Sequence, residues 1–228
     1  MPKLVDHEER RARLVEAVWA LAARSGLEGV TLRKVAAEAG VSMGQVQHYY
    51  PVMDRLLRDA LERAVLETNR AIERRIEAAG DHRPATLLRT CLHALIDTDA
   101  EGTRLIRFAV AVLGRAMSDP ATATVLGPGS EELLSFTAYL ITGARHARDG
   151  GEGPPEPADL VEADICWTLA TGLAVDTAIG LRTPEAARAV LDHHLTRLLG
   201  PEDPPGSPRQ GGRPEGTAGP SGGADAGS

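Results

Sequence analysis

The chain has 228 residues and carries 25 lysines and arginines against 32 aspartates and glutamates, a formal net charge of −7. Hydrophobic residues make up 43% of it but aromatic residues only 3%, which favours helices over a β-sandwich because strands are enriched in aromatic and β-branched side chains. The acidic balance excludes a surface that coats nucleic acid or anionic membrane throughout, but it leaves room for a local DNA-reading surface.

The two cysteines, Cys91 and Cys166, are too few for a disulfide framework and lack the spacing of zinc ligands. Each lies in an apolar helical pattern, which predicts a buried thiol. Residues 1–13 are too rich in charge for a signal peptide, and the longest apolar run falls far short of the ~20 residues of a membrane helix. We therefore predict a cytoplasmic protein with no cofactor, no metal and no membrane partner.

The first predicted helix starts near the N-terminus, where Asp6 followed by Glu9 resembles a capping box. Apolar residues then recur with the helical period until the break at Ser25-Gly26: Leu14, Val18, Leu21 and Ala22. Two short helices are predicted within residues 31–49, separated by Ala39-Gly40-Val41. A long helix follows from about residue 51 to 79, where Gly80 ends an apolar stripe with helical spacing.

Five more helices are predicted at roughly 84–97, 100–117, 130–148, 158–180 and 184–199. Glycine- and proline-rich loops separate them at 126–130 and 149–157. The last 29 residues contain nine glycines and six prolines and almost nothing apolar, which predicts a disordered tail.

The predicted fold is all-α, with about nine helices and no strand pattern. We divide it into an N-terminal three-helix, helix-turn-helix head (1–50), a larger C-terminal helical body for ligand binding and dimerisation (51–199) and the tail (200–228). Residues 1–60 hold nine lysines and arginines against eight acidic residues, so the acidity lies in the body and tail.

The segment 31–50 carries the most specific signal. Thr31 is placed to cap one short helix, and Gly40 lies where the chain must leave that helix with positive φ. Ser42 caps the next helix, and Gln45 three residues later completes a capping box. Two short helices joined by a glycine-containing turn, the second with an exposed polar face, are typical of a helix-turn-helix.

The side chains on this face suit DNA. Glutamine bonds adenine and arginine bonds guanine in the major groove, which favours Gln45, Gln47 and Arg33 as base readers. Phosphate contacts, which set register rather than sequence preference, suit Thr31, Lys34, His48 and Tyr49. Tyr50 is predicted to be core. Equally, a serine-capped short helix after a glycine turn occurs in many helical proteins that never touch DNA.

The stretch from Gly26 to Pro51 resembles the N-terminal DNA-binding region of the TetR family of bacterial regulators. The Thr-x-Arg pair after the glycines, Ala-x-x-Ala-Gly-Val-Ser, the Tyr-Tyr-Pro corner and the Leu56-Leu57 helix agree in order within about residues 8–60. The remaining helices resemble the family's regulatory domain only in number and length. The run from Val46 to Tyr50 resembles the subgroup typified by the choline–betaine regulator.

The resemblance implies a role for each matching residue. Arg33 reaches a base from the first short helix, Thr31 and Tyr49 contact phosphate, and the second helix faces bases or backbone. The complete predicted DNA set is Thr31, Arg33, Lys34, Ser42, Met43, Gln45, Gln47, His48 and Tyr49. Two positions depart from the family: Gln47 stands where tyrosine is frequent, and Met53 where a phosphate-contacting lysine is frequent. Loss of that lysine should weaken the salt-dependent part of binding.

Family members are homodimers, and the resemblance places the interface on the last two helices, at 160–181 and 183–199. The apolar stripe of the last helix has spacing suited to a partner helix. The predicted interface residues are Val175, Val190, Leu191, His194, Leu195 and Leu198. The alternative is that this stripe packs on its own domain.

A pocket for a small-molecule effector is expected among the helices from 84 to 180. Polar or aromatic residues embedded in apolar runs are its candidates: His93, Arg104, Phe108, Phe136, Tyr139, Trp167 and Thr171. Each has an alternative reading as core packing or as part of an exposed helix face.

The predicted function is that of a ligand-responsive transcriptional regulator, in the family's usual mode a repressor. It would bind a palindromic operator as a homodimer, with recognition helices about 34 Å apart. A protein–protein adaptor with a non-functional DNA head is one alternative. A helical enzyme is less favoured, because the adjacent His193 and His194 point in different directions on a helix and no nucleophile–base set is apparent.

Overall fold

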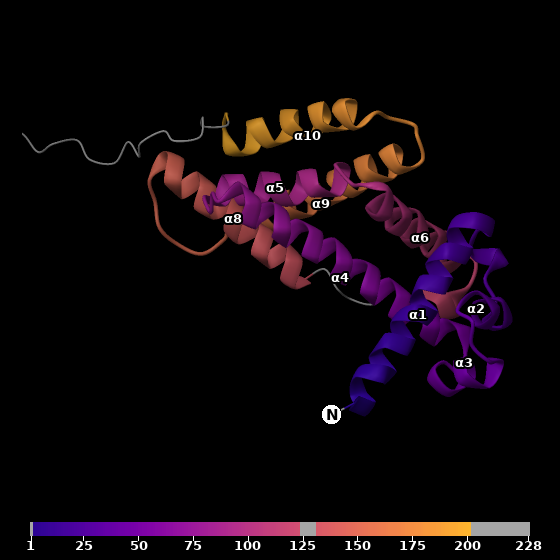
Figure 1. Cartoon of the computed structure of the whole chain (residues 1–228). Coiled ribbons are helices and arrows are strands. Elements are labelled where there is room, and N and C mark those ends of the chain that lie inside the picture. The colour runs from indigo at the N-terminus through magenta and orange to yellow at the C-terminus, as the bar shows by residue number, and fades with distance from the viewer. Residues whose placement is uncertain (1, 124–130, 202–228) are drawn as a thin grey trace, which may run out of the picture.

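The computed structural model describes residues 2–123 and 131–201, and within these ranges the chain is helical and contains no strand. The predicted loop at 126–130 and the predicted tail beyond residue 201 lie outside the described residues. In chain order the elements are α1 (Pro2–Ser25), η1 (Leu27–Gly29), α2 (Leu32–Glu38), α3 (Met43–Tyr49), α4 (Met53–Ala79), α5 (Pro84–Ile96), α6 (Ala100–Ala116), α7 (Pro120–Ala123), α8 (Glu131–Asp149), α9 (Pro157–Ala178) and α10 (Pro184–Leu199) (Figure 1).

The predicted all-α fold is confirmed, with three corrections to the elements, one of which is the short η1, which was not predicted. The first helix begins at Pro2 rather than Asp6, because proline at the first helical position loses no hydrogen bond and nothing between the two residues breaks a helix. A short α7 was not predicted; it begins at Pro120 in the same way. None of the described helices combines the length and apolar character that crossing a membrane requires.

A first hydrophobic core joins the N-terminal helices to α6. Its buried residues come from α1, η1, α2, α3 and the first half of α4, and from Leu105, Phe108 and Val112 of α6. Helix α6 packs against α1 (Figure 1). Tyr50 is 4% exposed in this core, as predicted, so the short helices α2 and α3 rest on a base that includes a helix from later in the chain.

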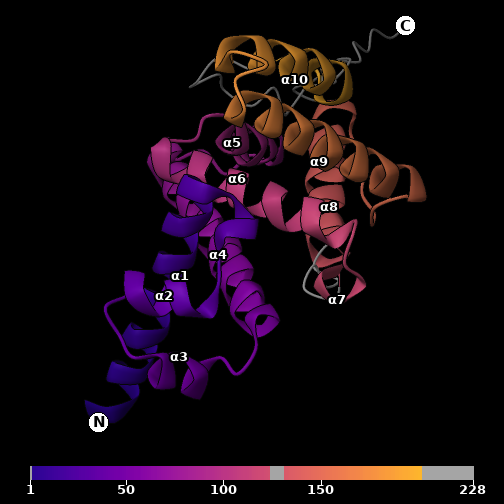
Figure 2. The same cartoon turned by 90° about the vertical axis from the view of Figure 1, so that its right-hand side faces the viewer.

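A second core lies among α5, α8, α9 and α10, at the end of the molecule opposite α3 (Figure 2). Leu92, Ile141, Leu191 and Leu195 are fully buried there. Cys166 is also buried, and desolvation together with the charge of Glu162 raises the pKa of its thiol to about 12. Both cysteines are buried and free, so the prediction of structural thiols is confirmed.

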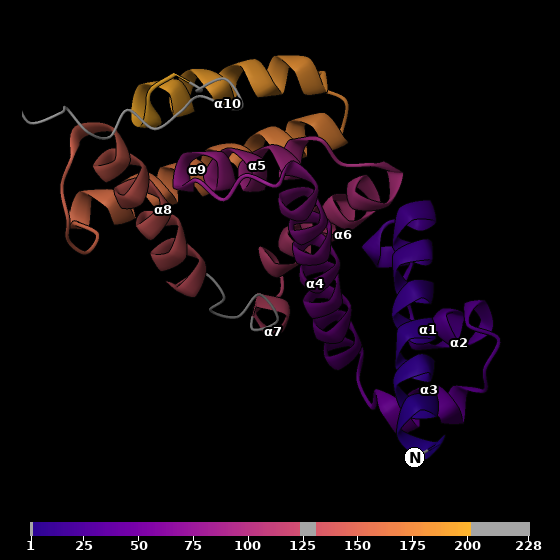
Figure 3. The same ribbon diagram turned by 60° about the vertical axis from the view of Figure 1, so that its left-hand side comes forward.

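Helix α4 connects the two cores (Figure 3). Its first half contributes Leu56 and Leu57 to the first core, and its last half packs against α5, where the Arg75 guanidinium donates to the Asp97 carbonyl. It ends at Gly80, as predicted, because Gly80 adopts the left-handed conformation (φ 62°) that other residues avoid. One continuous helix therefore has a part in the packing of both the head and the body.

Candidate nucleic-acid interface

The turn between α2 and α3 has the predicted geometry. The Thr31 hydroxyl accepts a hydrogen bond from the Lys34 amide at 3.2 Å and caps α2. Gly40 leaves α2 with φ 68°. A Cβ at Gly40 would meet no atom within 4 Å, so backbone conformation, and not space, requires glycine here. The turn therefore sets the angle at which α3 emerges from the head.

The predicted capping box at the start of α3 is formed. The Ser42 hydroxyl accepts from the Gln45 amide at 3.2 Å, and Gln45 Oε1 accepts from the Ser42 amide at 3.1 Å. Bidentate adenine recognition uses the glutamine oxygen and nitrogen together. Gln45 must therefore leave the box to read a base, whereas Gln47 lies outside the box.

Helix α3 turns Val46 into the first core, where it is fully buried. At about 100° per residue, Gly44 and His48 lie opposite Val46, and Gln45 and Gln47 lie on the two flanks; all four are exposed. A Cβ at Gly44 would meet no atom closer than 4.0 Å. The outermost face of α3 is thus open for a close approach of another molecule, a feature of Gly44 that sequence reasoning did not single out.

The remaining predicted DNA residues differ in whether their side chains are already hydrogen-bonded within the chain. Arg33 and Met43 are exposed, at the start of α2 and of α3. The Lys34 ammonium donates to the Gly29 carbonyl at 2.9 Å and is held against the 3-10 turn. The Tyr49 hydroxyl is hydrogen-bonded to His7 Nδ1 at 2.8 Å. His7 was missed because it lies in α1, 42 residues away, and only the packing of α1 on α3 brings the two rings together.

A hollow of about 510 Å³ opens beside the end of α3, between α1 and α4. Its lining residues are Arg11, Tyr49, Tyr50, Arg55, Arg58, Asp59 and Glu62. The Tyr50 hydroxyl donates to Asp59 at the inner wall, and burial followed by this hydrogen bond raises the pKa of Tyr50. Sequence reasoning missed the three arginines, because they come from two helices that are distant in the chain.

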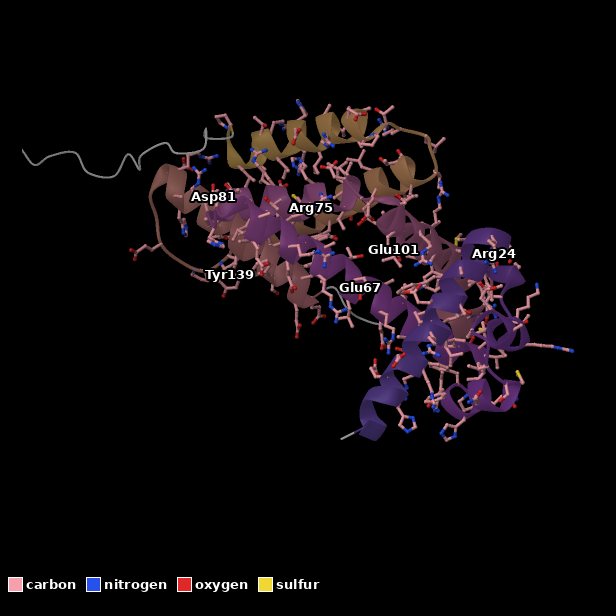
Figure 4. The ribbon with its side chains drawn as sticks, viewed as in Figure 1. Arg24, Glu67, Arg75, Asp81, Glu101 and Tyr139 are labelled. Carbon is pink, nitrogen blue, oxygen red and sulfur yellow. The ribbon has the colours of Figure 1, made fainter. Side chains whose placement is uncertain are left out.

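Phe108 and Arg104, two of the predicted ligand residues, lie instead where α6 packs against the head, so their assignment to a ligand pocket needs correction. Phe108 is 2% exposed in the first core. Arg104 lies 5.5 Å over the Trp19 ring and its guanidinium pairs with Glu16 of α1 at 3.1 Å; it also pairs with Glu101 at the start of α6 (Figure 4). Both residues join α6 to α1, because the face of α6 that carries them is covered by the head.

The other five predicted ligand residues are not brought together. Trp167 Nε1 donates to Thr137 at 2.7 Å, and His93 Nε2 lies 2.6 Å from an Asp192 carboxylate oxygen. Phe136 and Tyr139 are exposed on α8, where Figure 4 labels Tyr139, and Thr171 is exposed on α9. None of the seven predicted residues lines the hollow beside the end of α3, the hollow between η1 and α6, or the groove along α1 and the middle of α4.

The predicted dimer stripe divides in two. Leu191 and Leu195 are fully buried in the chain's own second core, so their assignment to an intermolecular surface is wrong, and the alternative of packing on their own domain holds. The other members are less covered: Val190 is exposed, and Val175, His194 and Leu198 are half-buried. The structure also exposes Val161 and Ile165 of α9 and Ile179 at its C-cap, which lie within the predicted interface segment 160–181 but were not among the predicted interface residues.

Sequence comparisons agree with this arrangement of head and body. Residues 14–60 match the family model described as bacterial regulatory proteins, tetR family, and residues 84–200 match the model described as BetI-type transcriptional repressor, C-terminal. The chain is 31% identical over 179 residues to the HTH-type transcriptional regulator PksA of Bacillus subtilis, covering 77% of this chain and 82% of that protein. It is 33% identical over 205 residues to the regulator BetI of Burkholderia mallei, covering 88% and 99%.

Solved structures share the fold. A transcriptional regulator from Rhodococcus sp. Rha1 matches with a TM-score of 0.68 and 28% identity, covering 83% of this chain and 95% of that one. A putative transcriptional regulator from Saccharomonospora viridis, solved in complex with choline, matches with a TM-score of 0.65 and 21% identity, covering 82% and 95%. The second match shows the fold alone.

Proposed function

Because the chain belongs to the TetR family of bacterial transcriptional regulators, we propose that it is a cytoplasmic repressor that binds a palindromic operator as a homodimer and is released by a small-molecule effector. The family consists of DNA-binding regulators and not of enzymes. The observation that carries the proposal is the uncovered polar face of α3, which two caps and a buried Val46 hold rigidly at the tip of the molecule.

Base reading by α3 follows from its exposed side chains. Gln47 is exposed and lies outside the capping box, so we assign it the glutamine contact that the major groove offers to adenine. Arg33 reaches from α2 toward the same groove and suits guanine. Gln45 then contributes to the shape of α3, and joins in base reading only after its oxygen leaves the Ser42 amide.

Dimerisation through α9 and α10 is supported by the exposed apolar side chains Val161, Ile165 and Ile179, with Val190 on α10. Exposed apolar surface is a usual mark of a protein–protein interface. Helix α10 lies at the end of the molecule opposite α3 (Figure 2), so an interface on α9 and α10 leaves the α3 helix of each copy uncovered. Sedimentation at micromolar concentration tests this: a stable monomer would contradict it.

The effector is proposed to act through α4 and α6, which connect the body to the head. A ligand that prefers one conformation shifts the population of the other, and a hundredfold change in DNA occupancy needs only about 2.7 kcal/mol of coupling. The relatives named BetI and the Saccharomonospora viridis regulator solved with choline make choline the first compound to test. Addition of choline should release the DNA if the effector belongs to that class.

The test is a fluorescence-anisotropy titration on the duplex from upstream of the gene and on a scrambled duplex. Gln47→Ala and Arg33→Ala should each lose about 1–3 kcal/mol of operator preference while the dimer persists. Arg74→Ala, an exposed arginine in the second half of α4, is the matched control and should keep the preference. Equal affinity of the unmodified protein for both duplexes would favour the adaptor alternative.

A further inference from the structure

We propose that the hollow between α1 and α4 is a second DNA-phosphate site, in which Arg11 and Arg55 replace the cation that position 53 lacks. This inference rests on the proposed function and names which residues of this chain hold the duplex beside α3. The hollow of about 510 Å³ adjoins the end of α3, because Tyr49 and Tyr50 form part of its wall.

The dimensions of DNA require such flanking contacts. Helix α3 has seven residues, a length of about 10 Å, and the major groove that receives it is about 12 Å wide. Phosphates of both strands therefore pass on either side of α3. The Lys34 ammonium is held by the Gly29 carbonyl, whereas the arginine hollow lies beside the end of α3.

The charge balance of the hollow favours an anion. Its inner carboxylate, Asp59, accepts from the Tyr50 hydroxyl and from Arg63 Nε at 3.2 Å, and the Arg63 guanidinium also pairs with Glu8. Arg55 is exposed, and no hydrogen bond or ion pair of its side chain occurs within the described part of the chain. The lining as a whole holds three arginines, Arg11, Arg55 and Arg58, against two carboxylates, Asp59 and Glu62.

Met53 cannot supply a positive charge for phosphate, but it has a structural role. Its side chain is half-buried and packs against the first core. Arg55 lies two residues further along α4, and its guanidinium reaches further than an ammonium would and bonds phosphate through two N–H groups. Arg11 approaches the same hollow from α1, close enough that its charge partly opposes the raised pKa of Tyr50.

The experiment measures how the affinity of the full chain for DNA depends on salt. Binding to the operator duplex and to a scrambled duplex is titrated from about 50 to 300 mM NaCl. The proposed homodimer carries each substitution twice, so Arg55→Gln and Arg11→Gln should each lower the slope of log K against log salt by about 2, and the double variant by about 4. Each should weaken both duplexes by the same factor, so operator preference stays unchanged.

Two controls separate charge from structure. Arg55→Lys keeps the charge and should keep the slope. Arg74→Gln lies about 28 Å further along α4 and should match the unmodified protein. Slopes for the Arg55 and Arg11 variants equal to that of Arg74→Gln would overturn the proposal. Absence of operator preference in the unmodified protein would instead contradict the proposed function, and the slopes on the scrambled duplex would still test the hollow.

Discussion

The two hydrophobic cores are built on different plans. The second core is closed among α5, α8, α9 and α10, the helices of the body. The first core mixes the head with α6, a helix that follows it by more than 30 residues in the chain. Helix α6 also donates from Arg107 to the Ala178 carbonyl of α9 at 2.8 Å. The difference shows that the head is not an appendage on a linker: the body supplies part of its base.

Because α6 belongs to the body and also completes the first core, we expect the two cores to unfold together. Each core has its own tryptophan as a fluorescent probe. Trp19 is buried in the first core and Trp167 packs against the second. Leu191→Ala should lower the free energy of unfolding by about 2–5 kcal/mol, because it leaves a cavity at a fully buried site. Urea unfolding is followed by fluorescence in two backgrounds: Trp167→Phe leaves Trp19 as the probe of the first core, and Trp19→Phe leaves Trp167 as the probe of the second. In both backgrounds Leu191→Ala should shift the urea midpoint by the same amount.

Leu56→Ala, in the first core, is the matched comparison and should behave in the same way, since Leu56 is also fully buried. Two separate midpoints, each moving only with the mutation in its own core, would show that α6 does not couple the two regions.

The coupling itself is tested at Arg104. Its guanidinium stacks over Trp19 and pairs with Glu16, so Arg104→Met, which keeps the apolar stem, should cost about 1–2 kcal/mol. It should also separate the two tryptophan midpoints. Arg70→Met removes an exposed pair within α4 and should cost at most about 0.5 kcal/mol with no separation. If Arg104→Met and Arg70→Met lost the same stability and neither separated the midpoints, the coupling between the two cores would come from apolar packing alone.

Within the first core, stability and DNA reading should be separable at α3. Ser42→Ala removes the cap and should cost about 1 kcal/mol in thermal unfolding. Gln47→Ala should leave the melting temperature unchanged and lower operator preference, because Gln47 is exposed and takes no part in the capping box. If Gln47→Ala lowered stability as Ser42→Ala does, the exposed face of α3 would have a structural role.

The smallest effect is expected at the contact between α1 and α3. His7 Nδ1 lies 2.8 Å from the Tyr49 hydroxyl, and the two rings are 5.7 Å apart. Tyr49→Phe and His7→Ala should each weaken DNA binding by about 0.5–1 kcal/mol. The double variant should lose little more than either single one, because His7 acts by holding Tyr49. Additive losses in this cycle would mean that each residue contacts DNA independently.

Local order along the chain was determined by the sequence itself. The positions of most of the helices, the Thr31 cap, the Ser42–Gln45 box and the positive φ of Gly40 follow from residue spacing over a few positions, and these were predicted; the start of α1 and the short η1 and α7 were not. These features depend on hydrogen bonds and backbone preferences between residues a few positions apart, so they can be predicted from the sequence without knowledge of the tertiary contacts.

Only the tertiary structure decided which helix covers which apolar stripe. The stripe on α10 predicts a buried face but does not say whether the same chain or a second copy buries it; the structure places Leu191 and Leu195 in the chain's own core. Arg104 meets Glu16 across 88 residues, and His7 meets Tyr49 across 42. Hydrophobic burial is non-directional, so the spacing of apolar residues shows that one face of a helix must be buried. Which neighbouring helix buries that face depends on how all the helices pack together.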